Sequence, residues 1–364
     1  MITSFYESYL LLVELCALFC VLVNVYNFAR YLSQGFRERR QMKREKLLTV
    51  WFQSYAEIAE VLSQREDRWL VKKLRKGFRH GRWLLAADSA LRRLMWTRPK
   101  TVPERLRRIL RDALLHNFRR FEHFDDPARG LVINVSVYSG LESRRLQRYL
   151  TDCMKRKPLY LRITALRGCA AQRDEALMLD VLDLVNRQDG DYSTKLLTDI
   201  LMEYAGDQKR LAEQMWLRLP GYSQALGCAY IGFLTYARNE AFCVRLLELI
   251  QNGSEEKELR IAAIKYFGAV PMPEAEPVLA RILDEEEWEY AAVAARTLQN
   301  YPSGAYGDIL VRSLSSRNWH VRYNSAMALV ACHPERVEEA LHSEDRYARD
   351  ILRYALDARG VVAV

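Results

Sequence analysis

The sequence predicts an all-α protein, in which one N-terminal transmembrane helix precedes a right-handed α-solenoid of helix pairs. Three observations lead to this expectation. One long apolar run lies near the start of the chain, Gly and Pro are sparse after it, and a pattern of 31 to 33 residues recurs in the C-terminal half. Stacked two-helix units of this length are typical of solenoids, because one unit alone cannot bury its apolar face.

The apolar run, YLLLVELCALFCVLVNVYN, occupies residues 9–27. With its flanks it reaches the roughly 20 residues that a helix needs to cross hydrocarbon. A cleaved signal peptide would need basic residues before this core and a small-residue cleavage site after it. Residues 1–9 contain no Lys or Arg, and residues 24–30 offer no such site. We therefore expect a short extracytoplasmic N-terminus at 1–8 and a transmembrane helix at 9–32.

Small and polar residues within the span favour a helix–helix interface. At 100° per residue most of them share one face about 100° wide, where close approach and interhelical hydrogen bonds are possible. The expected transmembrane partner face consists of Glu14, Cys16, Ala17, Cys20, Asn24 and Asn27. Glu14 lies off the main stripe by about 60°, where it either pairs with a partner's cation or is protonated. The alternative is a plain anchor whose polar groups reach the membrane surface.

A basic cluster follows the span and fixes its expected orientation. It consists of Arg30, Arg37, Arg39, Arg40, Lys43, Arg44 and Lys46. By the positive-inside rule, this cluster holds the C-terminal side in the cytoplasm. Each basic residue also contributes on the order of 1 kcal/mol to contact with anionic headgroups. Charge that only fixes topology and charge that binds lipid both stay open. A single N-terminal helix carrying a cytoplasmic solenoid is typical of a bacterial inner membrane.

Charge is unevenly distributed over the rest of the chain. Residues 30–120 hold 25 Lys or Arg and 9 Asp or Glu, or +16, whereas residues 121–364 sum to −5. We expect a basic helical neck at 33–100, whose first helix continues directly from the span because apolar residues recur there at steps of three and four. Two prolines in TRPKTVPE, at 97–104, predict a break. LVINVSVY, at 131–138, is the one stretch with the composition of a strand.

The repeat is clearest near the C-terminus. RNWHVRYNSAMAL, at 317–329, aligns with EEWEYAAVAARTL, at 286–298, and with KELRIAAIKYF, at 257–267. Each unit predicts a helix with small residues in its middle, a short turn and a second helix. Fainter copies extend upstream, so the solenoid is expected at 101–364, with its clearest repeats at 155–358.

Several large residues recur at fixed positions of the repeat. These are Trp288 and Trp319, and Arg162, Arg260 and Arg322. Because they recur in register, we interpret them as repeat-packing residues rather than ligand-binding residues. The acidic run LDEEEWE falls at a turn between units, where a solvated loop is the expected state.

WHVRYNSAMAL resembles the first helix of HEAT and HEAT-like repeats, which carries an aromatic residue, a Val-Arg pair and an alternating Ala run. Three copies in register strengthen the resemblance, and the TPLH and WxxLG motifs of ankyrin and tetratricopeptide repeats are absent. The resemblance implies a solenoid that binds other proteins. HEAT-like proteins of this sort resemble accessory subunits of membrane machines, such as a polysaccharide-synthesising glycosyltransferase or a secretion complex.

The sequence offers no catalytic, cofactor-binding or metal-binding residues. It contains no GxGxxG, GxxxxGK[ST], GxSxG or HExxH motif, and its seven cysteines form no CxxC pair. Some HEAT-like proteins are bilin lyases or DNA glycosylases, but here the positive charge lies in the neck and not along the clearest repeats.

We therefore expect a non-catalytic, membrane-anchored scaffold that binds a larger membrane protein complex through its span and its cytoplasmic solenoid. No small-molecule substrate is expected. The alternative is a membrane-tethered module that binds nucleic acid or anionic lipid through the basic neck.

Overall fold

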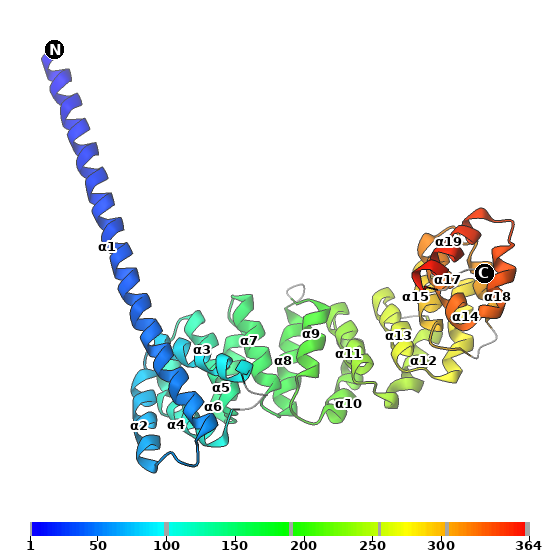
Figure 1. Ribbon diagram of the computed structural model, residues 1–364, viewed down its shortest axis with the longest axis horizontal. Helices are drawn as coiled ribbons and strands as arrows, with labels where there is room; N and C mark the ends of the chain where they lie inside the picture. The colour runs from blue at the N-terminus through cyan, green and yellow to red at the C-terminus, as the bar shows by residue number, and fades with distance from the viewer. Residues whose placement is uncertain (1, 98–101, 189–191, 254–255, 303–305, 361–364) are drawn as a thin grey trace. The chain divides into compact units, whose positions relative to one another are not determined.

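The computed structural model describes residues 2–97, 102–188, 192–253, 256–302 and 306–360, with side chains described from residue 15 onward. Over these ranges the chain is helical and contains no strand (Figure 1). The all-α prediction is confirmed. The one candidate strand, 131–138, lies inside helix α5 (Asp126–Ser139). Asp125 caps this helix and Gly140 ends it in the left-handed conformation, and these local signals outweigh the β-propensity of Val and Ile.

The described helices follow one another with short connections. Besides α5 they are α1 (Ile2–Glu57), α2 (Gln64–Gly77), α3 (Gly81–Thr97), α4 (Glu104–Phe121), α6 (Arg144–Met154), α7 (Leu159–Ala170), α8 (Glu175–Arg187), α9 (Thr194–Met202), α10 (Gln208–Arg218), α11 (Gln224–Tyr236), α12 (Cys243–Asn252), α13 (Lys257–Ala269), α14 (Glu276–Glu285), α15 (Trp288–Leu298), α16 (Gly307–Ser313), α17 (Trp319–Cys332), α18 (Pro334–Leu341) and α19 (Arg346–Ala358).

Two compact units divide the chain, Met1–Gly168 and Cys169–Val364. The first holds 34 Lys or Arg and 16 Asp or Glu, or +18, and the second holds 21 and 30, or −9. The charge asymmetry of the sequence is therefore an asymmetry between two folded units.

The first unit is built in two layers. Helices α1, α3 and α5 pack one on the next, and α2 packs on α4. Leu48, Phe52 and Tyr55, near the end of α1, are fully buried. The residues expected as a neck thus pack against the helices that follow them. The expected break has its centre, residues 98–101, outside the described residues.

The second unit repeats one arrangement. Helices α9, α11, α13, α15, α17 and α19 contact each other in that order, and a second layer contains α14, α16 and α18. Small buried side chains lie where the helices meet, namely Ala263, Ala294, Ala295, Ser325, Ala326 and Ala328. Thr198 on α9 donates a hydrogen bond from its Oγ1 to the carbonyl of Ala229 on α11, and a Cβ on Gly232 would lie only 2.9 Å from that Oγ1. This stacking confirms the prediction of an α-solenoid.

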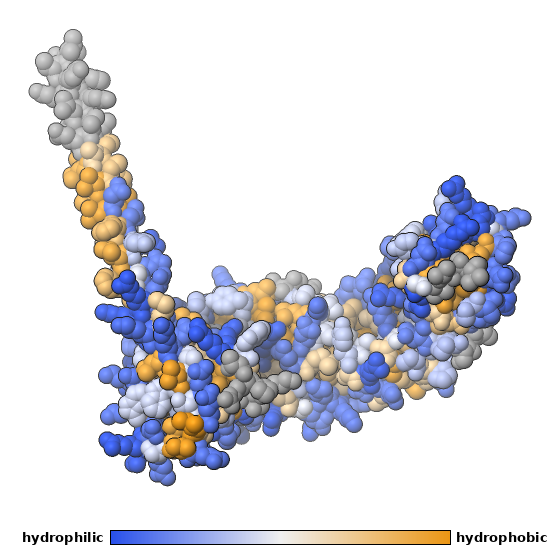
Figure 2. Space-filling model, in the orientation of Figure 1, coloured by the Kyte–Doolittle hydropathy of each residue, from blue (hydrophilic) through white to orange (hydrophobic). Residues whose placement is uncertain are grey.

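Helix α1 is continuous over 56 residues, or about 84 Å at 1.5 Å per residue. From Leu15 to Leu32 its described side chains are exposed. By length and composition it is the one helix among the described residues that is suited to cross a membrane. Figure 2 shows its apolar surface giving way to hydrophilic side chains where the helix approaches the folded unit.

Candidate interaction surfaces

The polar stripe of the apolar segment lies on an unbroken helix. Cys16, Ala17, Cys20, Asn24 and Asn27 are all exposed on α1, whereas the side chain of Glu14 lies outside the described residues. Asn24 donates a hydrogen bond from its Nδ2 to the carbonyl of Cys20 at 2.8 Å. This bond satisfies one amide hydrogen within the helix, and it leaves the Asn24 Oδ1 directed away from its own backbone as an acceptor.

The seven basic residues that follow this segment also lie on α1. All are exposed except Arg44, which is half-buried and whose Nη1 lies 3.4 Å from Gln41 Oε1. Six of the seven therefore have open access to solvent or to headgroups.

Helix α1 joins the folded unit at Gln41. There Gln41 donates a hydrogen bond from its Nε2 to the carbonyl of Arg82 on α3, at 3.1 Å. One turn later, the Glu45 carboxylate forms an ion pair with Arg93 at 2.6 Å. From this point to its last turn, α1 is a helix of the solenoid.

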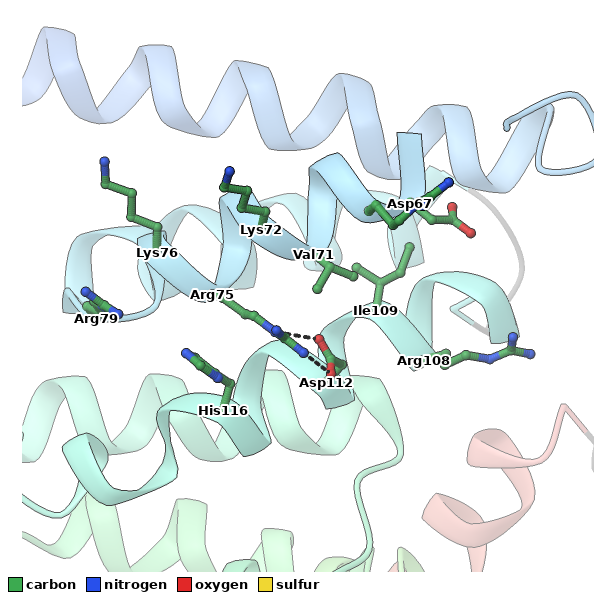
Figure 3. A pocket seen from close by; sticks show the side chains of 11 residues that line it. Asp67, Val71, Lys72, Arg75, Lys76, Arg79, Arg108, Ile109, Asp112 and His116 are labelled. Carbon is green, nitrogen blue, oxygen red and sulfur yellow. Dashed lines mark hydrogen bonds and ion pairs between the residues drawn. The ribbon is translucent and has the colours of Figure 1, made fainter. Parts of the chain in front are cut away.

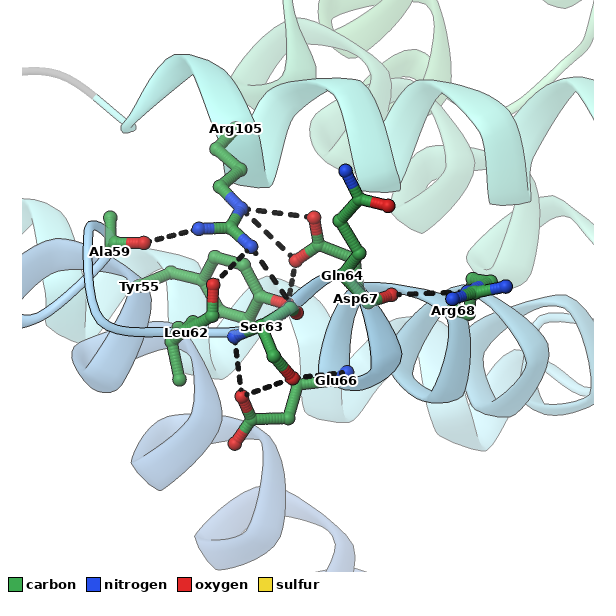
Figure 4. A network of polar contacts seen from close by, with 9 residues as sticks. All are labelled: Tyr55, Ala59, Leu62, Ser63, Gln64, Glu66, Asp67, Arg68 and Arg105. Atoms are coloured by element: carbon green, nitrogen blue, oxygen red, sulfur yellow. Dashed lines mark hydrogen bonds and ion pairs between the residues drawn. The ribbon is translucent and has the colours of Figure 1, made fainter.

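A polar network locks the far end of α1 (Figure 4). Arg105 on α4 donates from its guanidinium to the carbonyls of Ala59 and Leu62, and its Nε lies 2.9 Å from Asp67 Oδ2. Tyr55 donates its hydroxyl to Asp67 Oδ1 at 2.6 Å. Burial, followed by this bond to the carboxylate, raises the pKa of Tyr55 above its usual value, so the phenol stays protonated and keeps donating. The network ties α1, α2 and α4 together at a single point.

A basic groove of about 800 Å³ lies between α2 and α4 (Figure 3). We call it the α2–α4 groove. Its lining residues are Asp67, Arg68, Val71, Lys72, Arg75, Lys76, Arg79, Arg108, Ile109, Asp112 and His116. Arg75 forms two hydrogen bonds to Asp112, at 2.7 and 2.9 Å, and this pairing raises the Arg75 pKa. Both lining carboxylates are thus already paired, Asp112 with Arg75 and Asp67 with Arg105.

A second basic cavity, of about 740 Å³, lies between α4 and α6. Arg119, Arg145, Arg148 and Arg156 line it, together with the buried Arg129. The Arg129 guanidinium lies 3.1 Å from Asp152 and 5.3 Å from the centre of the Tyr149 ring. The first unit therefore presents cations on two successive grooves of its second layer.

Arginines at the start of the repeats connect neighbouring helices in the second unit. Arg260 on α13 donates from its Nη2 to the carbonyl of Ile250 at 2.7 Å and pairs with Glu286, which precedes α15, at 2.5 Å. Arg322 on α17 donates to the carbonyl of Ser316 at 2.7 Å and lies over the ring of Tyr347 on α19. Arg162 is buried on α7.

The recurring tryptophans lie at the surface and form part of an aromatic ladder, which we define as Trp288, His320, Trp319, Tyr323 and Tyr354. Trp288 stacks on His320 at 6.0 Å, Trp319 stacks on Tyr323 at 5.0 Å, and Tyr323 contacts Tyr354 at 6.0 Å. The ladder thus crosses α15, α17 and α19. Trp288 and Trp319 are 47% and 50% exposed, so each ring has one packed and one open side.

Comparison with known families decides the nature of these repeats. Residues 243–330 match a family model described as HEAT repeats. The chain is a HEAT-repeat protein. The matched segment includes α12 to α16 and most of α17, and it contains Arg260, Trp288 and Trp319. HEAT repeats are characteristic of protein-interaction scaffolds. No curated protein matches the chain.

The HEAT register also accounts for Arg129, which the sequence analysis missed. Arg129 lies 33 residues before Arg162, at the same step that separates the clearer repeats. Its clamp on the carbonyl of Phe124 corresponds to the clamp of Arg260 on Ile250. The offset was readable in the sequence, but the Val-rich stretch after Arg129 concealed the repeat.

The described residues hold no group of three or more His, Cys, Asp or Glu that could hold a metal ion. The seven cysteines are free thiols. Burial raises the pKa of Cys153 and Cys228 to about 11, so both thiols are protonated at neutral pH.

Proposed function

We propose that this HEAT-repeat protein is a non-catalytic, membrane-anchored scaffold that binds a larger membrane protein complex. The observation that carries the proposal is the continuity of α1, which runs without interruption from an exposed apolar segment into the buried core of the first unit. A helix built in this way transmits the position and rotation of a membrane span directly to the solenoid.

This coupling gives the span and the HEAT repeats one common task. The Arg105 network and the Gln41 contact fix α1 to the first unit at two points about 14 residues apart, or about 21 Å. A partner that contacts the stripe of Asn24 and Asn27 would therefore meet the solenoid at a high effective concentration. The two weak surfaces would act as one strong one.

The basic residues after the apolar segment support a topology with the N-terminus outside and the solenoid in the cytoplasm. The charge pattern suits a bacterial inner membrane. The proposed client is an integral membrane complex, for which a polysaccharide-synthesising glycosyltransferase or a secretion machine is the class that HEAT-like accessory subunits suggest.

Purification of the full chain from native membranes in a mild detergent, followed by mass spectrometry, tests this function. We expect the chain in the membrane fraction together with a stoichiometric integral membrane protein. A fragment that begins at Ser33 keeps the buried end of α1 and provides the control, because it should be soluble and should lose the partner. Recovery of the full chain alone and monomeric under several gentle conditions contradicts the proposal.

The α2–α4 groove favours one part of the alternative function, the binding of an anion by the basic region of the first unit. For nucleic acid, a gel shift with a steep dependence on salt would support this alternative. For lipid, the position of the groove leads to a more specific inference.

A further inference from the structure

The cations of the α2–α4 groove lie mainly toward one end. Helices α2 and α4 run parallel, since Asp67 pairs with Arg105 and Arg75 pairs with Asp112 further along both helices. The start of α2 is bound to the last turn of α1 through Tyr55 and Asp67. The end of α2 and the start of α3 lie level with Gln41, because Gln41 contacts the carbonyl of Arg82. Lys72, Lys76 and Arg79 thus approach the end of the unit that faces the apolar segment (Figure 3).

This end of the groove holds positive charge that no described carboxylate neutralises. Asp67 and Asp112 are the only acidic residues that line the cavity, and both are occupied by arginines. Lys72, Lys76 and Arg79 are exposed and form no described ion pair. His116, on α4, lines the same end. A cluster of several cations around a cavity of this size suits a phosphate-bearing ligand.

The distance along α1 favours a lipid as the source of the phosphate. Tyr31, Leu32 and Phe36 are exposed, and aromatic and apolar residues of this kind lie in the interfacial layer of a membrane. Only five residues, or about 8 Å of helix, separate Phe36 from Gln41. The flexible side chains of Lys76 and Arg79 can cover such a distance, and tilt of the helix shortens it further.

We propose that the Lys72, Lys76 and Arg79 end of the α2–α4 groove binds the phosphate of an anionic phospholipid headgroup in the cytoplasmic leaflet. This inference rests on the membrane anchoring in the proposed function. The lipid would hold the first unit against the membrane surface and so set the tilt at which α1 presents its polar stripe. A lipid that occupies the groove adds a third attachment point to the two that fix α1.

Native mass spectrometry of the full chain in detergent micelles tests the assignment. Phosphatidylglycerol is the anionic probe, and phosphatidylcholine is the zwitterionic probe, which carries a phosphate without net charge. We expect one phosphatidylglycerol to bind in preference to phosphatidylcholine. Lys72→Gln, Lys76→Gln and Arg79→Gln together should remove this preference, each change weakening binding by about fivefold. All three side chains are exposed, so the core is unaffected.

The matched control is Arg37→Gln with Arg39→Gln and Arg40→Gln, which removes the same charge from the exposed part of α1. Equal losses in the two triple variants, or a loss confined to the control, overturn the groove assignment. ATP and inorganic phosphate form a further arm. If they bind to the chain in zwitterionic micelles, compete with phosphatidylglycerol and are lost in the groove variant, then the ligand is a soluble phosphate compound and not a lipid.

Two readouts separate failure of this inference from failure of the proposed function. Membrane fractionation of the same preparations reports the anchoring of α1. Partner recovery reports the scaffold function. A chain that is anchored and keeps its partner but shows no preference for phosphatidylglycerol overturns the lipid site alone.

Discussion

The carboxylate of Asp67 on α2 lies 2.9 Å from the guanidinium Nε of Arg105 on α4. The same carboxylate accepts the hydroxyl hydrogen of Tyr55 on α1. Two charged groups therefore close the end of the first helix pair, and the guanidinium also satisfies carbonyls that α1 leaves unpaired after its last turn.

Substitution of Arg105 should loosen the junction of α1 with the first unit. Arg105→Gln removes the donors to Ala59 and Leu62, so we expect faster amide hydrogen exchange over residues 52–62 and unchanged exchange in the second unit. Arg111→Gln is the control, because it breaks an exposed pair with Glu104 on α4 itself. Unchanged protection of residues 52–62 would show that apolar packing alone holds the end of α1.

Substitution of Arg260 should destabilise the second unit locally. Arg260 is 6% exposed, and Arg260→Gln leaves Glu286 and the carbonyl of Ile250 without their donor. Loss of a buried, charged hydrogen-bond donor costs about 2 to 3 kcal/mol. Arg312→Gln, which breaks an exposed pair with Asp284, should cost less than about 1 kcal/mol. Denaturant unfolding of the two variants measures the difference, and similar costs would refute the structural role of Arg260.

The helical repeat was predictable from the sequence because its signal is physical and local. Small residues such as Ala294 and Ala326 must recur wherever helices stack closely, and turns must recur between them. The continuation of α1 into the first unit was also indicated, by the spacing of apolar residues from Leu47 to Leu62. The burial of Leu48 and Tyr55 against α3 was not, since one amphipathic helix does not show what covers its face.

The candidate site was less predictable than the fold. The basic residues of α2 and α4 were visible as net charge, but their gathering around one groove depends on the parallel packing of two helices 40 residues apart. The exposure of Trp288 and Trp319 was not foreseen either. A residue that recurs in register packs on its neighbour, and recurrence says nothing about whether its other side is open.

The stability of the first unit should depend on the ionisation of Asp88. This carboxyl is 4% exposed on α3, and its burial, opposed by nearby Arg92, raises its pKa above the ordinary 3.8. The folded state therefore binds this proton more readily than the unfolded state, so the ionised form lowers stability at neutral pH. We expect Asp88→Asn to be more stable than the wild type at pH 7.

The sign of the pH dependence tests the assignment. As pH falls through the raised folded-state pKa, the wild type should gain stability relative to Asp88→Asn, and the gain should be complete below 3.8, the unfolded value. Thermal unfolding of both proteins between pH 7 and 3 measures this difference. A difference that does not vary with pH would mean that the Asp88 carboxyl titrates normally.

The aromatic ladder should contribute more to partner binding than to folding. Trp288→Ala with Trp319→Ala removes two half-exposed rings, whose stacking is worth about 0.5 to 1.5 kcal/mol each. We expect modest destabilisation and a clear loss of partner recovery, since exposed Trp is enriched at binding hot spots. Trp96→Ala, which removes a 92% exposed ring from the first unit, is the control. Undiminished recovery of the partner with the double variant would leave the tryptophans a packing role only.

The polar stripe of α1 provides the most direct test of the scaffold function. Asn24 already satisfies one amide hydrogen on the carbonyl of Cys20, so its remaining polar capacity is available to another helix in the membrane. Asn24→Leu with Asn27→Leu makes the segment more apolar, so membrane insertion should be maintained or strengthened while partner recovery falls. Leu18→Ala with Leu22→Ala alters the opposite side at 100° per residue and should leave recovery intact. If the Asn variant recovers its partner as well as the wild type does, the segment is a tether and the solenoid alone binds the complex.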